Sequence, residues 1–201
     1  MDSTSEIAAH QRLLDGLAIE AAFVRIVTLR GGHAWPSTYH DHSRPRPRPV
    51  PGDGAPLLWT PSGFEAAPDM LVSHPSLTAV SPVEIRSKDS FRVDGEFVFG
   101  LDASKLRSLE AAAAFGPPLI IFRDARILPL PRQQDGNVDV EELMAIDAST
   151  DFAAWRGVSL LQAMAAGRWL ESAKGRWFVV PKRATSRLEA IIPWADPLAD
   201  F

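Results

Sequence analysis

The sequence has no cysteine among its 201 residues. A chain without cysteine has no disulfide framework, no thiolate metal site and no cysteine nucleophile. The absence suits the reducing cytosol, so we expect a cytoplasmic protein. No apolar run approaches the roughly 20 residues of a membrane-spanning helix, and the polar, acidic residues 1–6 lack the pattern of a signal peptide. We therefore expect no membrane partner.

The chain also lacks an excess of positive charge. It holds 21 Lys and Arg against 25 Asp and Glu, a formal net charge of −4. This balance argues against binding to nucleic acid by overall attraction and leaves a local basic groove as the remaining route. The composition, 46% hydrophobic and 23% charged, is that of a globular domain with one core and room for an appended element.

The first long pattern is helical and runs over residues 6–30, where Gly31-Gly32 ends it. Its expected apolar stripe consists of Leu13, Leu17, Val24 and Val27. Glu20 falls within that stripe. A carboxylate there is costly to bury unless it is paired, hydrogen-bonded or bound to a metal. Glu20 is therefore either at the edge of the stripe, reaching solvent, or delivered to a functional site.

Two polar segments follow a short strand expected at residues 33–39. His40 and His42 form a His-x-His pair of the kind that binds zinc, but no further ligand stands at motif spacing, so surface histidines are the simpler interpretation. A Pro/Arg-rich loop occupies residues 44–56, with arginines at alternate positions near its start. These arginines either contact phosphates or belong to a solvated insertion.

The middle of the chain alternates strands and helices. We expect strands at residues 67–74, 80–87 and 96–99, a helix at 102–115 and an uninterrupted apolar strand at 119–122. A strand that is apolar throughout is covered on both faces of its sheet. The order helix, three strands, helix, strand predicts an α/β fold with a central mixed β-sheet flanked by helices.

The patterns weaken after residue 124. We therefore expect a core at 1–124 and a C-terminal extension at 125–201 packed on it. Within the extension we expect a strand at 126–130, helices at 138–145 and 159–172, and a strand at 176–181. Its tryptophans are expected to serve packing. The acidic, apolar tail either docks on its own domain or is recognised by a protein partner.

One pair of expected strands directs charged side chains to a common place. Asp69 opens the first strand, and Glu84 follows on the next after fourteen intervening residues. Residues i and i+2 of a strand share a face, so Glu84, Arg86 and Lys88 line one side of theirs. If the two strands pair, Asp69 reaches the same place. Two carboxylates beside a cation form a Mg²⁺ site that faces phosphate.

Pro68-Asp69 followed by Glu84-Ile85-Arg86 resembles the motif of the PD-(D/E)XK nuclease superfamily. The element order is similar as well, because a leading helix carries a glutamate before a glycine turn, a hairpin bears the acids, and a helix and a buried strand follow. Residues 84–122 are most similar to small bacterial nuclease-fold domains of unknown function. The resemblance covers roughly residues 6–124 and implies a restriction-endonuclease-like core.

The resemblance implies a Mg²⁺-dependent DNA endonuclease in which Asp69 and Glu84 hold the metal and Glu20 is a further ligand. Such domains often act as homodimers. The sequence departs from the motif at its lysine, where position 86 is arginine. Arginine clamps phosphate but stays charged, so it is a poor proton carrier. Lys88, about 6–7 Å further along the strand, is the candidate to replace that lysine.

Three other interpretations remain open. Arg86, the net negative charge and the tail fit a catalytically inactive nuclease-like protein that binds protein or nucleic acid. His40 and His42 would fit a metal-dependent hydrolase. The motif would also arise by coincidence, since Asp after Pro often starts a strand and Glu-x-Arg on a strand is often a surface ion pair worth under about 1 kcal/mol.

Overall fold

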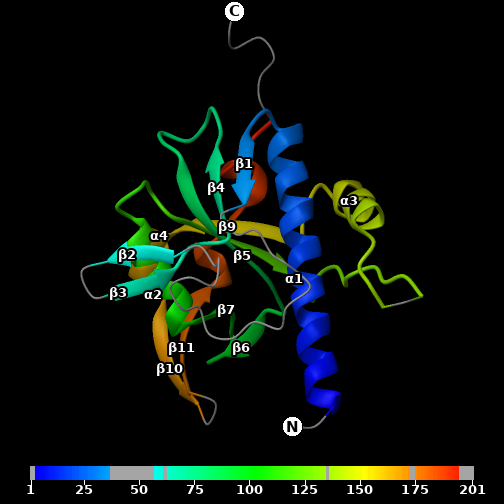
Figure 1. Ribbon diagram of the computed structural model, residues 1–201, viewed down its shortest axis with the longest axis horizontal. Coiled ribbons are helices and arrows are strands. Elements are labelled where there is room, and N and C mark those ends of the chain that lie inside the picture. Colours follow the sequence, from blue (N-terminus) through cyan, green and yellow to red (C-terminus); the bar gives the residue numbers. More distant parts are fainter. Residues whose placement is uncertain (1–2, 37–56, 61–62, 135, 173–174, 195–201) are drawn as a thin grey trace, which may run out of the picture.

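A computed structural model of the protein describes residues 3–36, 57–60, 63–134, 136–172 and 175–194 (Figure 1). The predictions for His40 and His42, for the Pro/Arg-rich loop and for residues 195–201 of the tail lie outside the described residues. Among the described helices, none has the length and apolar character of a membrane span.

The centre of the fold is a six-stranded mixed sheet in the order β1-β4-β5-β8-β9-β12. Only β5 and β8 run parallel; the other neighbours in this sheet are antiparallel. The strands are β1 (His33–Pro36), β4 (Met70–Ser73), β5 (Ser81–Lys88), β8 (Leu119–Asp124), β9 (Trp155–Ser159) and β12 (Ser186–Arg187). The predicted α/β fold with a central mixed sheet is therefore confirmed.

A smaller antiparallel sheet in the order β10-β11-β7-β6 and a separate β2–β3 hairpin lie beside the central sheet (Figure 1). The strands of these units are β2 (Leu57–Thr60), β3 (Gly63–Ala66), β6 (Phe91–Val93), β7 (Glu96–Asp102), β10 (Arg168–Ser172) and β11 (Gly175–Pro181). Asp94 and Gly95 join β6 to β7, both with positive φ, as a tight Asp-Gly hairpin turn requires.

Helices complete the layers on both faces of the central sheet. They are α1 (Ser3–Leu29), α2 (Ala103–Ala112), α3 (Val140–Ser149) and α4 (Leu160–Ala166), with short 3₁₀ turns at Lys182–Ala184 and Leu188–Ala190. α1 and α3 pack with β4, β5 and alternate residues of β8 in one apolar cluster. α2, α4, β7 and β11 pack against the opposite face in a second cluster.

Strand β8 connects the two clusters. Ile121 belongs to the cluster under α1, whereas Ile120 and Phe122 belong to the cluster under α2. All six residues of the strand are buried. The prediction of a strand covered on both faces is thus confirmed. Because β5 pairs with β8 in register, the alternation along β8 also shows which face of the sheet each β5 side chain occupies.

The predicted stripe of α1 differs from the buried one. Val27 is buried, but the remaining buried apolar residues of α1 are Ile19, Ala22, Phe23 and Ile26. Leu13 is 41% exposed. Several sides of this helix carry apolar residues, so spacing alone does not single out the face that packs. Glu20 lies beside the buried face and is half-buried.

Two predictions for the C-terminal part were wrong. The expected helix at 159–172 ends at Ala166, and Arg168–Ser172 is strand β10, because these residues pair with β11. Gly167 lies against the Phe178 ring, where an added Cβ would come within 2.4 Å of it. No strand forms over 126–130, where the chain turns instead. The helix expected at 138–145 is present as α3, and the strand at 176–181 as β11.

Residues after 124 contribute to both sheets. β9 and β12 extend the central sheet, and β10 and β11 pair onto β7. The C-terminal part is therefore built into the fold and does not form a layer of its own.

Candidate active site

Asp69 stands immediately before β4 and faces β5. Met70 pairs with Val83, so one further step of this antiparallel register sets Asp69 opposite Glu84. The Ile85 N–H donates to Asp69 Oδ2 at 2.7 Å. This hydrogen bond fixes the carboxylate across the strand pair and leaves Oδ1 to face other groups.

Glu84 lies in the middle of β5 with its side chain fully buried. It pairs in register with Ile120, while the adjacent Ile85 belongs to the cluster under α1. Because strand residues alternate, Glu84 and Arg86 lie on the face covered by α2. Oε1 of Glu84 forms ion pairs with Arg86 and Lys105, whereas Oε2 has no hydrogen-bond partner among the described residues.

Lys105 is the cation that sequence reasoning missed. Its Nζ lies 3.0 Å from Glu84 Oε1 and 3.6 Å from Asp69 Oδ1. It comes from the first turn of α2, which carries no acidic residue. A cation is disfavoured by the dipole at a helix N-terminus. That misplaced charge, on the helix expected to cover the strand pair, is the sequence signal that points to Lys105.

Glu84 and the nearby Glu20 both have raised pKa values. Burial, followed by repulsion from Asp69, raises the pKa of Glu84 to about 7. Burial, with repulsion from Asp69 and then from Glu84, raises the pKa of Glu20 to about 8. Arg86 and Lys105 oppose both shifts. Both glutamates are therefore held closer to their protonated form at neutral pH than an ordinary carboxyl group, chiefly because they are buried.

The structure brings together Asp69, Glu84 and Arg86, and Glu20 lies close enough for their charges to shift its pKa. Within the described ranges, no three His, Asp or Glu side chains converge as a ready-made metal cluster. Glu20 as a third ligand stays a prediction.

The described contacts of Lys88 are not with the paired carboxylates. Its Nζ lies 5.5 Å from the centre of the Trp177 ring, a cation–π contact with β11. It also lines an open cleft of about 400 Å³ at the end of β5, together with Asp15 and Arg132. The structure thus places Lys88 one pleat beyond Arg86, as expected, and places Lys105 between the acids.

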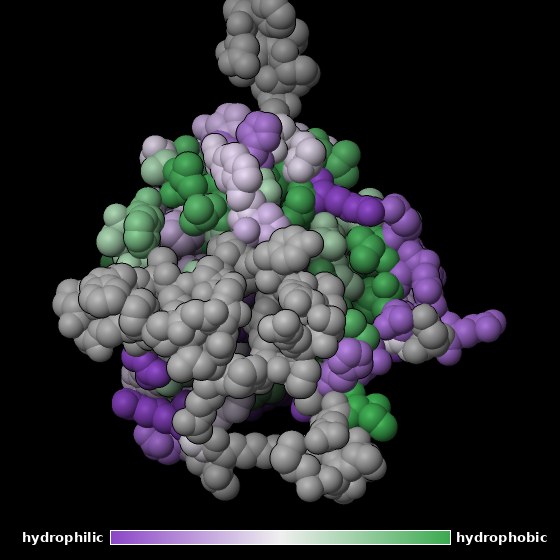
Figure 2. All heavy atoms as spheres, in the orientation of Figure 1, coloured by the Kyte–Doolittle hydropathy of each residue, from purple (hydrophilic) through white to green (hydrophobic). Residues whose placement is uncertain are grey.

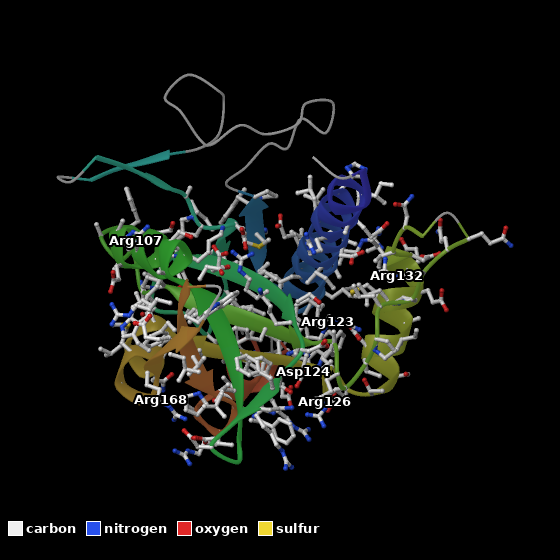
Figure 3. The ribbon with its side chains drawn as sticks, turned by 90° about the horizontal axis from the view of Figure 1, so that it is seen from below. Arg107, Arg123, Asp124, Arg126, Arg132 and Arg168 are labelled. Atoms are coloured by element: carbon white, nitrogen blue, oxygen red, sulfur yellow. The ribbon has the colours of Figure 1, made fainter. Side chains whose placement is uncertain are left out.

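Sequence reasoning also missed a buried charged network behind the site. Arg123, at the end of β8, donates to both oxygens of Asp147 on α3 at 2.9 and 2.8 Å, and Trp155 Nε1 donates to Asp147 Oδ2 at 2.6 Å. Figure 3 shows Arg123 in the interior, whereas Arg107 lies on the outer side of α2. Arg123 and Asp147 are fully buried, so this network joins α3 to the central sheet.

Comparison with known proteins gives two loose structural likenesses. No protein-family model matches the chain, and no curated protein matches it. The chain is similar to a Holliday junction resolvase, Hjc, from Archaeoglobus fulgidus, at 11% identity and a TM-score of 0.47, over 90% of this chain and 98% of that one. It is also similar to D212, a nuclease from a fusselovirus, at 12% identity and a TM-score of 0.40, over 95% and 92% of the two chains. With both scores below 0.5, the function proposed below depends on the geometry of the site itself.

Proposed function

We propose that this protein is a Mg²⁺-dependent DNA endonuclease that hydrolyses phosphodiester bonds at Asp69 and Glu84. The observation that carries the proposal is the convergence of Asp69, Glu84 and Lys105 from three separate elements on one face of the central sheet. Burying two acids beside one another is costly, so this arrangement is weak evidence for an ion pair that serves stability alone. Raised pKa values of clustered carboxyl groups are typical of functional sites.

The donor set fits a hard divalent cation. Glu84 Oε2 and Asp69 Oδ1 would hold it, because two cations engage Glu84 Oε1 and the Ile85 N–H donates to Asp69 Oδ2 at 2.7 Å, whereas the contact of Asp69 Oδ1 with Lys105 is longer, at 3.6 Å. The unpartnered, buried Oε2 is a costly feature for a protein unless a ligand uses it. When bound, such a metal supplies an activated water and neutralises charge on the phosphate.

The chain's own cations have separate tasks in this proposal. Lys105, one quarter exposed between the two acids, stabilises the charge that builds on the scissile phosphate. Arg86 cannot shuttle a proton, so it clamps a phosphate oxygen. Lys105 thereby takes the role that the resemblance gives to a lysine at position 86. A homodimer that presents two such sites to DNA is part of the proposal.

Nicking of supercoiled plasmid tests the proposal. The parent protein should nick DNA with Mg²⁺ and not with EDTA, and Asp69→Ala and Glu84→Ala should each lose the activity when purified in parallel. Glu110→Gln, an exposed acid on the same helix as Lys105, serves as the matched control and should cut like the parent. Equal nicking by all four proteins would mean that a contaminant or another site cuts.

One observation favours a second candidate, a catalytically inactive nuclease-like binding module. Arg86 pairs directly with Glu84 and occupies the oxygen that a second metal contact would use. Under this alternative the parent binds DNA without cutting it. Nicking that appears only in Arg86→Lys would support the inactive module, and nicking by the parent would remove it.

A further inference from the structure

Strand β1 carries a half-exposed aromatic pair at the edge of the central sheet. Trp35 is 50% exposed, and its ring stacks on His33 with centroids 5.9 Å apart and an angle of 27° between the planes. Trp35 pairs in register with Leu71, which is itself 38% exposed. Figure 2 shows hydrophobic residues at the surface over the β4–β5 hairpin, beside paler and more hydrophilic residues over β1. Trp35 and Leu71 are therefore both partly open to solvent at this edge of the sheet.

The aromatic pair shares a face with the candidate active site. Ala34 packs against the cluster under α1, so His33 and Trp35 on either side of it face the opposite way. Leu71 lies two residues from Asp69, on the same face of β4 and about 6–7 Å along the strand. Trp35 sits across from Leu71, roughly 5 Å further between Cα atoms. The Cα of Trp35 is therefore about 8 Å from that of Asp69 and about 12 Å from that of Glu84, which lies one strand further across the sheet.

The charges on this face fit a nucleic-acid strand. Arg86 and Lys105 keep 22% and 26% of their side chains exposed beside Asp69 and Glu84. Arg86 lies beyond Glu84 on the side away from Leu71, whereas Lys105 lies 3.6 Å from Asp69 Oδ1. A backbone phosphate at Lys105 would leave its neighbouring base on the side of the site where Trp35 lies. Aromatic side chains bind bases by stacking, which works for every base but requires that the base is not already stacked within a duplex.

We propose that Trp35, supported by His33, is a stacking platform for an unpaired base next to the scissile phosphate. The substrate class is DNA that contains a single-stranded flank or a displaced base, in preference to continuous duplex. The inference rests on the proposed function for the identity of the ligand, but stacking is measured without cleavage. Trp35 is thus a specificity residue and not a catalytic one.

Binding in EDTA tests this inference separately from cleavage. The probes are a single-stranded oligonucleotide carrying 2-aminopurine and the same sequence as a blunt duplex. For the parent, the 2-aminopurine fluorescence should be quenched on the single strand. Trp35→Ala should weaken single-strand binding by about 5- to 150-fold, equivalent to about 1–3 kcal/mol, and duplex binding by less than about twofold. Trp35→Phe should restore most of the affinity.

Leu161→Ala on α4 is the matched control, because Leu161 is an 81% exposed apolar residue distant in sequence from the aromatic pair. It should bind both probes like the parent.

Unchanged single-strand binding and quenching in Trp35→Ala would overturn the inference. So would a change from dimer to monomer in Trp35→Ala with unchanged DNA affinity, since the face would then be an interface between copies of the chain. Metal-dependent nicking without stacking would refute only this inference; stacking without nicking would refute only the nuclease proposal.

Discussion

The Lys105→Met substitution tests whether Lys105 is the cation that stabilises the Asp69–Glu84 pair. The ammonium lies 3.0 Å from Glu84 and 3.6 Å from Asp69. At an effective dielectric constant of about 20, a unit charge pair at this distance gains about 5 kcal/mol before desolvation. The cost of desolvation and the partial exposure of Lys105 offset most of that gain. We expect the variant to lose about 1–3 kcal/mol of unfolding free energy, which lowers Tm by roughly 3–10 °C.

The loss should depend on pH with a definite sign. The pKa values of Glu84 and Glu20 are about 7 and about 8, so both groups are largely protonated at pH 5 and Lys105 then faces less negative charge than at pH 8. Between pH 5 and pH 8 they ionise in the folded protein, so the loss of the Lys105 charge costs more unfolding free energy as the pH rises. The Tm difference between parent and Lys105→Met, measured by scanning calorimetry, should therefore be larger at pH 8 than at pH 5.

The same variant separates Lys105 from Lys88 in catalysis. Removing one preorganised group that stabilises transition-state charge typically costs about 10²–10³ in rate, and we expect that loss of plasmid nicking in Lys105→Met. Lys88→Met is the matched control, because its Nζ sits over Trp177. It should change the rate by less than about threefold, or roughly 0.7 kcal/mol. A larger loss in Lys88→Met than in Lys105→Met would refute the assignment.

Three further predictions concern stability. Glu20→Gln should raise Tm at pH 9 but not at pH 4. The pKa of Glu20 is raised to about 8 in the folded protein, so its ionisation destabilises the fold as pH rises from about 4.5 to about 8. Equal Tm shifts at both pH values in calorimetry would contradict this. Asp147→Ala should cost about 3–5 kcal/mol in urea denaturation, since it leaves Arg123 buried and unpaired; a cost below about 1 kcal/mol would show that the network is dispensable. Gly116→Ala should destabilise the fold by more than about 2 kcal/mol, because its Cβ would come within 2.0 Å of the Val80 carbonyl oxygen and its φ is +159°; a midpoint equal to the parent's would contradict that contact.

The sequence indicates the acids of the site because local rules place them. Strand alternation puts Glu84 and Arg86 on one face, and a short antiparallel connection sets Asp69 opposite Glu84. Both rules need only neighbouring residues. The buried strand β8 is equally visible as an apolar run between breakers.

The remaining features depend on packing between distant segments. Lys105 reaches Asp69 and Glu84 only because α2 crosses over β5, which its own sequence does not specify. Arg168–Ser172 became a strand because β11 pairs with it, although its local pattern continues a helix. Arg123 and Asp147 are 24 residues apart, so their pairing could not be read from spacing.

The central claim is that Asp69 and Glu84 jointly hold a divalent metal. A crystal structure after soaking in Mn²⁺, with anomalous diffraction data, tests it most directly. We predict an anomalous peak bonded to Asp69 Oδ1 and Glu84 Oε2, about 2.0–2.2 Å from each oxygen. The absence of a peak at this pair, with Arg86 and Lys105 still bound to Glu84, would contradict the claim.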